Sequence, residues 1–221
     1  LKESNVIVIS NYEKLEFAEQ SKELKEDNEF VFDPKYFHIV YVGGIGPMRG
    51  LDTVISGVAE LKKKEVPVKF VILGSGNSLY VQGLKDQCKS LQVESEVLFL
   101  GYKEFSKVNF YMQKADVNII PHVRNGHTDF TIPHKLFQIF LSKAPLLVSS
   151  CKPLKRIVEE CDGGWVFEAS TVPDLVSKVE EIRNSTKDEI LQKTTNAFEI
   201  ASKKYNWETE SFRLAEFYGG I

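Results

Sequence analysis

The side chains most able to do chemistry gather in one stretch, residues 121–135, directly after a short apolar run. This stretch holds His122, His127 and His134, three of the four histidines of the chain, together with arginine, aspartate and lysine side chains. Such groups could bind an anion, exchange protons or bind a metal. The histidine spacing matches no standard ligand pattern, so no metal is expected. So many polar groups beside a buried strand favour a functional site over a solvated loop.

Two separate features of the sequence could bind an anion such as a phosphate. The loop at residues 43–50, Gly-Gly-Ile-Gly-Pro-Met-Arg-Gly, has glycines that let a backbone approach a phosphate closely, and Arg49 supplies a planar cation. A tight turn between a strand and a helix is the alternative interpretation of that loop. Further along, Pro133 suits the first turn of a helix, where free N–H groups and Lys135 would attract an anion.

The glycines do not form the fingerprint of a nicotinamide-dinucleotide site. The pattern G-x-G-x-x-G fails at Arg49, and the second apolar run is followed by Gly74 and Ser75 where an acid would hold a ribose. A nicotinamide-dependent oxidoreductase is therefore disfavoured. For residues 74–76 alone, a structural turn is favoured over a ligand loop.

The elements that would position these loops are short apolar runs without polar alternation, which are typical of strands buried on both faces of a parallel sheet. These runs lie at residues 39–42, 70–73, 97–100, 117–120, 146–148 and 164–167, and helices are predicted at 51–61, 77–91, 104–113, 133–143, 153–161, 171–184, 186–204 and 207–218. The alternation predicts an α/β fold, a Rossmann-like doubly wound parallel sheet with helices on both faces. In such a sheet ligands bind beyond the carboxyl ends of the strands.

The first 35 residues do not follow this alternation. Residues 5–11 have the pattern of one strand that ends at a turn, and residues 14–30 are polar and acidic, as in a connection on the surface. We therefore expect a domain boundary after residue 35, with one domain over residues 36–221.

Composition and charge exclude several classes of function. The net charge is −3 and no basic block is present, so nucleic acid is not expected as a partner. The cysteines, Cys88, Cys151 and Cys161, lack CxxC spacing and are interpreted as free thiols in a reducing compartment. No apolar run approaches the roughly 18 residues of a membrane span, and no signal-peptide pattern opens the chain.

Several short motifs, taken in chain order, resemble those of a known family. They lie at residues 8–11, 41–44 with 49–52, 70–76, 97–102, 115–121, 131–138 with Pro145, and 205–207. Each is weak alone, but their order and spacing are similar to the carboxyl-terminal, donor-binding domain of GT-B glycosyltransferases of the group-1 (family four) type. On this resemblance residues 1–35 are the linker and the end of a missing acceptor domain, and residues 36–221 are the donor domain with its C-terminal helices.

The resemblance implies transfer of a hexose from a nucleotide-diphosphate sugar to an acceptor, with retention of anomeric configuration and without a metal or other cofactor. The acceptor, a glycan, lipid or small molecule, would bind through the missing N-terminal domain, so the isolated domain is expected to be inactive. The full-length enzyme would be cytoplasmic, with peripheral attachment to the inner membrane face as the alternative.

The same resemblance assigns site residues. Arg49 and Asp129 are the catalytic candidates, and Arg49 would stabilise the charge that develops on the leaving diphosphate. The candidates for donor and nucleotide binding are Gly43, Gly44, Arg49, Gly74, Gly101, Tyr102, Thr131, Pro133, Lys135 and Gln138.

The sequence departs from the family pattern at the two carboxylates of the E-x7-E motif. Gln138 stands where a glutamate bonds the ribose hydroxyls, and Phe130, with Asp129 beside it, stands where a carboxylate reaches the donor sugar. Gly44 replaces an arginine that is often present, and Lys143 replaces a glycine. A non-catalytic nucleotide-binding or interaction module with a degenerate site is therefore the alternative function. Because a carboxylate accepts stronger hydrogen bonds, Gln138→Glu is expected to be tolerated or to tighten nucleotide binding.

Overall fold

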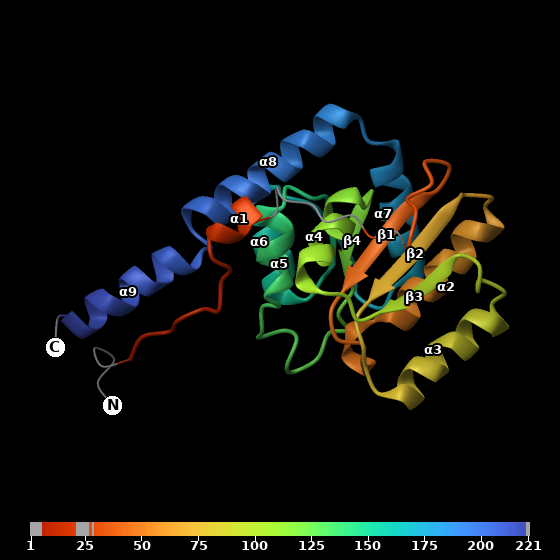
Figure 1. Cartoon of the computed structure of the whole chain (residues 1–221), viewed down its shortest axis with the longest axis horizontal. Helices are drawn as coiled ribbons and strands as arrows, with labels where there is room; N and C mark the ends of the chain where they lie inside the picture. Colours follow the sequence, from red (N-terminus) through yellow and green to blue (C-terminus); the bar gives the residue numbers. More distant parts are fainter. Residues whose placement is uncertain (1–5, 21–26, 28, 220–221) are drawn as a thin grey trace.

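The structure is a computed structural model that describes residues 6–20, 27 and 29–219 (Figure 1). Within these residues six parallel strands form one sheet in the order β3-β2-β1-β4-β5-β6. The strands are β1 (Phe37–Val42), β2 (Val68–Leu73), β3 (Val97–Gly101), β4 (Val117–Ile120), β5 (Leu146–Ser149) and β6 (Trp165–Phe167). The six strands predicted between residues 39 and 167 are all confirmed.

Helices cover both faces of the sheet, as expected for a doubly wound fold (Figure 1). Alternate residues of a strand point to opposite faces, so the sheet contributes to apolar clusters on each side. One face packs against α2 (Leu51–Lys63), α3 (Ser78–Ser90) and α7 (Val172–Asn184). The other packs against α4 (Phe105–Lys114), α5 (Lys135–Leu141), α6 (Lys152–Cys161) and α8 (Lys187–Lys203). The final helix, α9 (Trp207–Gly219), extends away from the sheet (Figure 1).

The strand order places a crevice between β1 and β4. After β1 the chain moves outward through β2 to β3, and it then returns to β4 on the other side of β1. The connections that leave β1 and β4 therefore diverge, which opens space beyond the carboxyl ends of these strands. The loops that carry Arg49 and the histidine-rich stretch both begin at this point.

The N-terminal segment differs from the sequence-based expectation. Residues 6–11 have no regular secondary structure, so the strand predicted at 5–11 is wrong for its described part, and Asn5 lies outside the described residues. Val6 and Val8 are 56% and 76% exposed. An apolar run is stable as a strand only where neighbouring elements bury its side chains, and here none does so for these two valines.

The predicted surface connection at residues 14–30 is also only partly correct. It contains a short helix, α1 (Glu16–Gln20), whose Phe17 is buried in the cluster around α5 and α8. Phe30 packs edge-on against His38 and lies beside Tyr111, so this part of the segment is held on the sheet domain. Residues 21–26 and 28 lie outside the described residues. The domain boundary after residue 35 stays a prediction.

Candidate functional site

Two glycine-containing loops lie side by side beyond the strands. The Gly43 amide donates to the Leu73 carbonyl over 2.9 Å, and the Ile45 amide donates to the Ser75 carbonyl over 2.9 Å. Gly74 has φ of +139°, and a Cβ at this position would lie 1.9 Å from the Gly43 carbonyl oxygen. The glycine at position 74 is therefore required by backbone packing, as expected for a structural turn.

Arg49 ends a short 3₁₀ turn, η2 (Pro47–Arg49), and its guanidinium Nη1 donates to Nε2 of His122 over 3.1 Å. His122 is only 3% exposed. Burial, together with the charges of Lys135 and Arg49, lowers the pKa of His122 to about 3. The imidazole is therefore neutral near pH 7, and Nε2 is its acceptor because a guanidinium can only donate. The sequence singled out both residues but gave no sign that they meet.

Lys135 is the first residue of α5, and its side chain reaches the end of β1. The ammonium Nζ donates to the Val42 carbonyl over 2.8 Å and lies 3.9 Å from the centre of the Tyr41 ring. Burial and the charge of Arg49 hold the pKa of Lys135 well below its usual range. Two basic groups therefore face the same space, and an anion between them would favour the charged form of Lys135.

This cationic space is a cavity of about 330 Å³ at the carboxyl ends of β1 and β4. Its walls are Val42, Gly43, Gly44, Arg49, His122, His127, Thr131, Ile132, Pro133, His134, Lys135 and Gln138. Near this cavity Arg124 forms an ion pair with Asp129, and His134 lies beside Glu13. Within the described part of the chain, no carboxylate is in ion-pair contact with Arg49 or Lys135. We call this space the cationic cavity.

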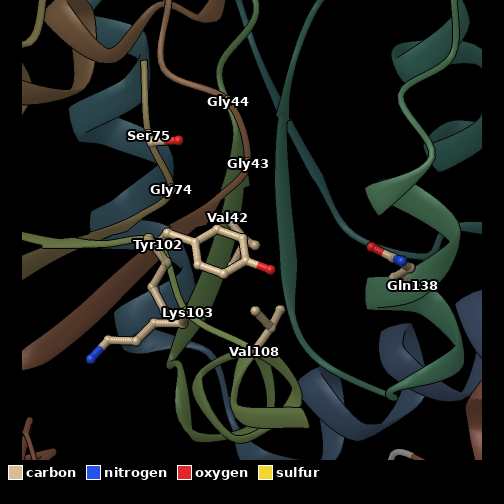
Figure 2. A pocket seen from close by; sticks show the side chains of 10 residues that line it. Val42, Gly43, Gly44, Gly74, Ser75, Tyr102, Lys103, Val108 and Gln138 are labelled. Carbon is tan, nitrogen blue, oxygen red and sulfur yellow. The ribbon is translucent and has the colours of Figure 1, made fainter. Parts of the chain in front are cut away.

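A second cavity, of about 340 Å³, adjoins the cationic cavity (Figure 2). It is lined by Val42, Gly43, Gly44, Leu73, Gly74, Ser75, Tyr102, Lys103, Val108 and Gln138. The two cavities share Val42, Gly43, Gly44 and Gln138, so they form one groove along the end of β1. Tyr102 is 77% exposed on one side of the second cavity and Gln138 lies on the opposite side (Figure 2).

The ammonium group of Lys103 is engaged outside the second cavity. It forms ion pairs with Glu29 and, over 3.0 Å, with the buried carboxylate of Asp27. Burial disfavours the charge of Asp27, but hydrogen bonds from Lys103, the Glu29 amide and Tyr111 outweigh it and lower the pKa of Asp27 to about 2. This buried pair fixes the N-terminal segment to the loop after β3 and leaves the second cavity largely apolar.

Most of the predicted site residues line this groove. The cationic cavity contains Gly43, Gly44, Arg49, Thr131, Pro133, Lys135 and Gln138, and the second cavity adds Gly74 and Tyr102. Gly101 lies directly before Tyr102 and has φ of +69°, and its carbonyl accepts from the Gly74 amide over 2.8 Å. The helix predicted at residues 133–143 spans only Lys135–Leu141, so Pro133 lies before it. The cationic character of the cavity therefore comes mainly from the side chains of Arg49 and Lys135.

Asp129 lies outside both cavities. Its carboxylate accepts from Arg124 Nη2 over 3.0 Å and from the Lys152 amide, at the start of α6, over 3.2 Å. The hydrogen bonds from Arg124 lower the pKa of Asp129. Phe130 beside it is 78% exposed. The contacts of Asp129 join the histidine-rich loop to α6, and its catalytic assignment stays a prediction.

Gln138 has a partner that sequence inspection did not suggest. Its Nε2 donates to Oε2 of Glu13 over 2.9 Å, across a separation of 125 residues. The same Glu13 oxygen lies 3.7 Å from His134 Nε2, and the Glu13 side chain is only 14% exposed. A carboxylate from the N-terminal segment therefore lies directly behind a wall residue of the groove.

In the described ranges no cluster of three His, Cys, Asp or Glu side chains is arranged as a metal site would require. None of the described helices has the length and apolar character needed to cross a membrane.

Known proteins share both sequence and fold with this chain. Residues 21–203 match the family model described as glycosyl transferases group 1. WcaL of Escherichia coli (strain K12), named for glycosyl transfer in colanic acid biosynthesis, is 23% identical over 178 residues, which are 80% of this chain and 43% of WcaL.

Solved structures extend the likeness to the fold. HepE of Anabaena, solved in complex with UDP-glucose, superposes with a TM-score of 0.80 at 17% identity over 97% of this chain and 57% of HepE. The C-terminal domain of LpcC, a glycosyl transferase group 1 family protein from Francisella tularensis, superposes with a TM-score of 0.64 at 12% identity over 90% of this chain and 96% of that domain. The chain thus spans about half of WcaL and HepE, at 43% and 57%.

Proposed function

The chain belongs to the group 1 glycosyl transferases, and from this premise we propose that it binds the nucleotide-diphosphate sugar of a retaining hexosyltransferase. The observation that carries the proposal is the pair of half-buried basic side chains, Arg49 and Lys135, which line one cavity and have no ion-pair contact with a carboxylate in the described residues. A diphosphate has the charge and the size that this arrangement accommodates. The UDP-glucose complex of HepE, a protein of the same fold, supports this class of ligand.

The groove suggests how such a donor would lie. The diphosphate would occupy the cationic cavity between Arg49 and Lys135, and the base would occupy the more apolar second cavity near Tyr102. The ribose joins these two parts of the molecule, and Gln138 lies where the two cavities meet. In this arrangement the Gln138 amide is within reach of the ribose hydroxyls.

The chemistry follows from where charge develops. As the bond between the anomeric carbon and the phosphate oxygen breaks, negative charge grows on the leaving diphosphate, and positioned cations stabilise that transition state. In our proposal Arg49 and Lys135 supply this stabilisation without a metal. The acceptor would bind to a further domain, because the chain covers only 43% and 57% of the length of WcaL and HepE. The 221-residue chain alone is then expected to transfer no sugar.

A second candidate function is a nucleotide-binding module without transferase activity. It is favoured by one observation, which is that the two carboxylates beside the groove are already engaged. Asp129 is paired with Arg124, and Glu13 accepts from Gln138. Such a module would bind the nucleotide, and an attached sugar would add no affinity.

Thermal shift and calorimetry with UDP, GDP, ADP and their glucose conjugates test both functions. A ligand at 100 times its dissociation constant adds about 2.7 kcal/mol to the free energy of unfolding, which is readily measured. Tighter binding of one nucleotide sugar than of its free nucleotide supports the donor function, and equal binding supports the module. If no nucleoside diphosphate binds, both functions are wrong.

A further inference from the structure

The contact between Glu13 and Gln138 fixes the direction of an amide at the groove. A carboxylate has only acceptors near pH 7, so the NH₂ end of the Gln138 amide must face Glu13, as its 2.9 Å hydrogen bond shows. The opposite end, Oε1, then points toward the second cavity, and Figure 2 shows the amide oxygen on that side. Among the described residues no group donates a hydrogen bond to this oxygen.

Glu13 is itself held in place by contacts that do not involve its carboxylate. Its carbonyl accepts from the Trp207 amide over 2.9 Å at the start of α9. The preceding Tyr12 ring packs edge-on against Phe137 and Tyr205, with ring centres 4.7 Å and 5.3 Å away. The backbone is thus anchored on two sides, and the carboxylate is directed at Gln138 with little freedom. Oε1 of the carboxylate also accepts from the neighbouring Lys14 amide over 2.8 Å. Replacing the carboxylate therefore removes this local bond but leaves the Trp207 and Tyr12 contacts.

We propose that Glu13 is a positioning residue for nucleotide binding, which orients the Gln138 amide so that Oε1 accepts hydrogen bonds from the ribose hydroxyls. This inference rests on the proposed function, because it requires a ribose at the junction of the two cavities. The Glu13 charge polarises the amide through its N–H, which makes Oε1 a stronger acceptor. The pair thereby presents one polarised acceptor oxygen to the ligand, where a carboxylate at position 138 would present two.

From the sequence, Gln138→Glu is expected to be tolerated or to tighten nucleotide binding. The proposal predicts the opposite, which is weaker binding. A glutamate at 138 would place a second carboxylate at hydrogen-bond distance from Glu13, and two carboxylates so close repel each other. The exchanged pair, Glu13→Gln with Gln138→Glu, re-forms the hydrogen bond in the opposite direction and keeps one charge. These variants therefore distinguish a positioning pair from two independent residues.

The test is calorimetric titration of the 221-residue chain with UDP, GDP and ADP and with their 2′,3′-dideoxy forms. The measured quantity is the affinity ratio between each nucleotide and its dideoxy form, which reports the ribose contacts alone. Glu13→Ala should reduce this ratio about five- to tenfold, as expected for the loss of an oriented hydrogen bond. Gln138→Glu should reduce it by a similar factor, and the exchanged pair should restore it to within about twofold of the unmodified chain.

Glu16→Gln is the matched control, because Glu16 lies on the same segment, is exposed and bonds only to Gln20 in the described structure. It should leave the ratio unchanged, and thermal unfolding of every variant shows whether the fold is retained. If Glu13→Ala keeps the ratio, or if the exchanged pair binds no better than Gln138→Glu, Glu13 does not position Gln138 and the proposed function still stands. If the unmodified chain binds no nucleoside diphosphate, the proposed function fails and this inference fails with it.

Discussion

Arg49 and His122 are 73 residues apart in the sequence and are joined by a hydrogen bond of 3.1 Å in which a buried, neutral imidazole accepts from the guanidinium. A carboxylate in the place of the imidazole would orient the guanidinium equally well, but it would also neutralise the charge. The imidazole orients Arg49 and leaves its full positive charge for the cationic cavity. The loop after β4 thus prepares the loop after β1 to bind an anion.

The first prediction concerns Arg49 itself. Arg49→Ala should weaken the binding of a nucleoside diphosphate by about 1.5–3 kcal/mol, the range for a hydrogen bond to a charged group. Calorimetric titration of the variant and of the unmodified chain measures the difference. Arg183→Ala, which removes an exposed arginine in the last turn of α7, is the control and should change nothing. Equal affinities for Arg49→Ala and the unmodified chain would show that the diphosphate lies elsewhere.

A second prediction separates orientation from neutralisation at His122. His122→Gln keeps a neutral acceptor near Arg49, so diphosphate affinity should remain within about threefold of the unmodified chain. His122→Asp keeps an acceptor but adds a charge that pairs with Arg49, and affinity should fall more than about tenfold. The two variants are compared by calorimetry after their thermal stability has been measured. Equal diphosphate affinities for the two variants would mean that the charge of Arg49 does not contribute to binding.

The third prediction is acid destabilisation caused by His122. Its pKa is about 3 in the folded chain against 6.5 for the free side chain, so between these values the unfolded state binds more protons. The free energy of unfolding therefore decreases as pH falls below 6.5, and this decrease should reach about 2–3 kcal/mol at pH 4.5. His122→Gln should remove this loss, as measured by urea unfolding at several pH values. Asp27, whose pKa is lowered from 3.8 to about 2, reduces the free energy of unfolding only as pH falls below 3.8.

A fourth prediction follows from the lowered pKa of Lys135. Burial and Arg49 disfavour its charge, and a bound diphosphate would raise its pKa again, so binding should take up a proton. The affinity for the diphosphate should then fall as pH rises between two values, which are the lowered pKa of Lys135 in the free protein and its raised pKa in the complex. Titrations between about pH 7 and 9.5 avoid the phosphate ionisation near pH 6.

The control for this fourth prediction is Lys135→Arg. An arginine keeps its charge throughout this range, so binding to the variant should show a flat pH profile and no proton uptake in buffers of different ionisation enthalpy. A profile with the same slope in both proteins would exclude Lys135 as the titrating group.

The fold could be predicted from local sequence because its signals are local. The runs at residues 39–42 in β1 and 70–73 in β2 are apolar throughout and lie mostly buried within the sheet, and the helix α2 between them has an apolar face. The failure at residues 6–11 has the same physical basis, since an apolar run indicates a strand only when something covers it. Nothing within that run distinguishes Val8, which is exposed, from a buried strand valine.

The site could be predicted only in part. Gly43, Arg49 and Lys135 follow from loop composition and from a resemblance in order and spacing, and the structure places them around one cavity. The contacts that orient the site bridge 73 residues for His122 and 125 residues for Glu13. Such contacts depend on strand order and on where the N-terminal segment crosses α5, which no local pattern encodes.

The last prediction concerns Asp129, for which sequence and structure suggest different roles. A residue that acts on the donor sugar needs a free carboxylate facing the cavity. Both Asp129 oxygens instead accept hydrogen bonds, from Arg124 and from the Lys152 amide. We therefore expect Asp129→Asn to lower the thermal midpoint by loosening the histidine-rich loop from α6, and to leave the affinity ratio between a nucleotide sugar and its nucleotide unchanged. Arg124→Gln removes the same ion pair from the other side and should reproduce both results. If Asp129→Asn lowers the ratio while Arg124→Gln does not, the Asp129 carboxylate leaves Arg124 when the donor binds and contacts the sugar, as the family resemblance implies.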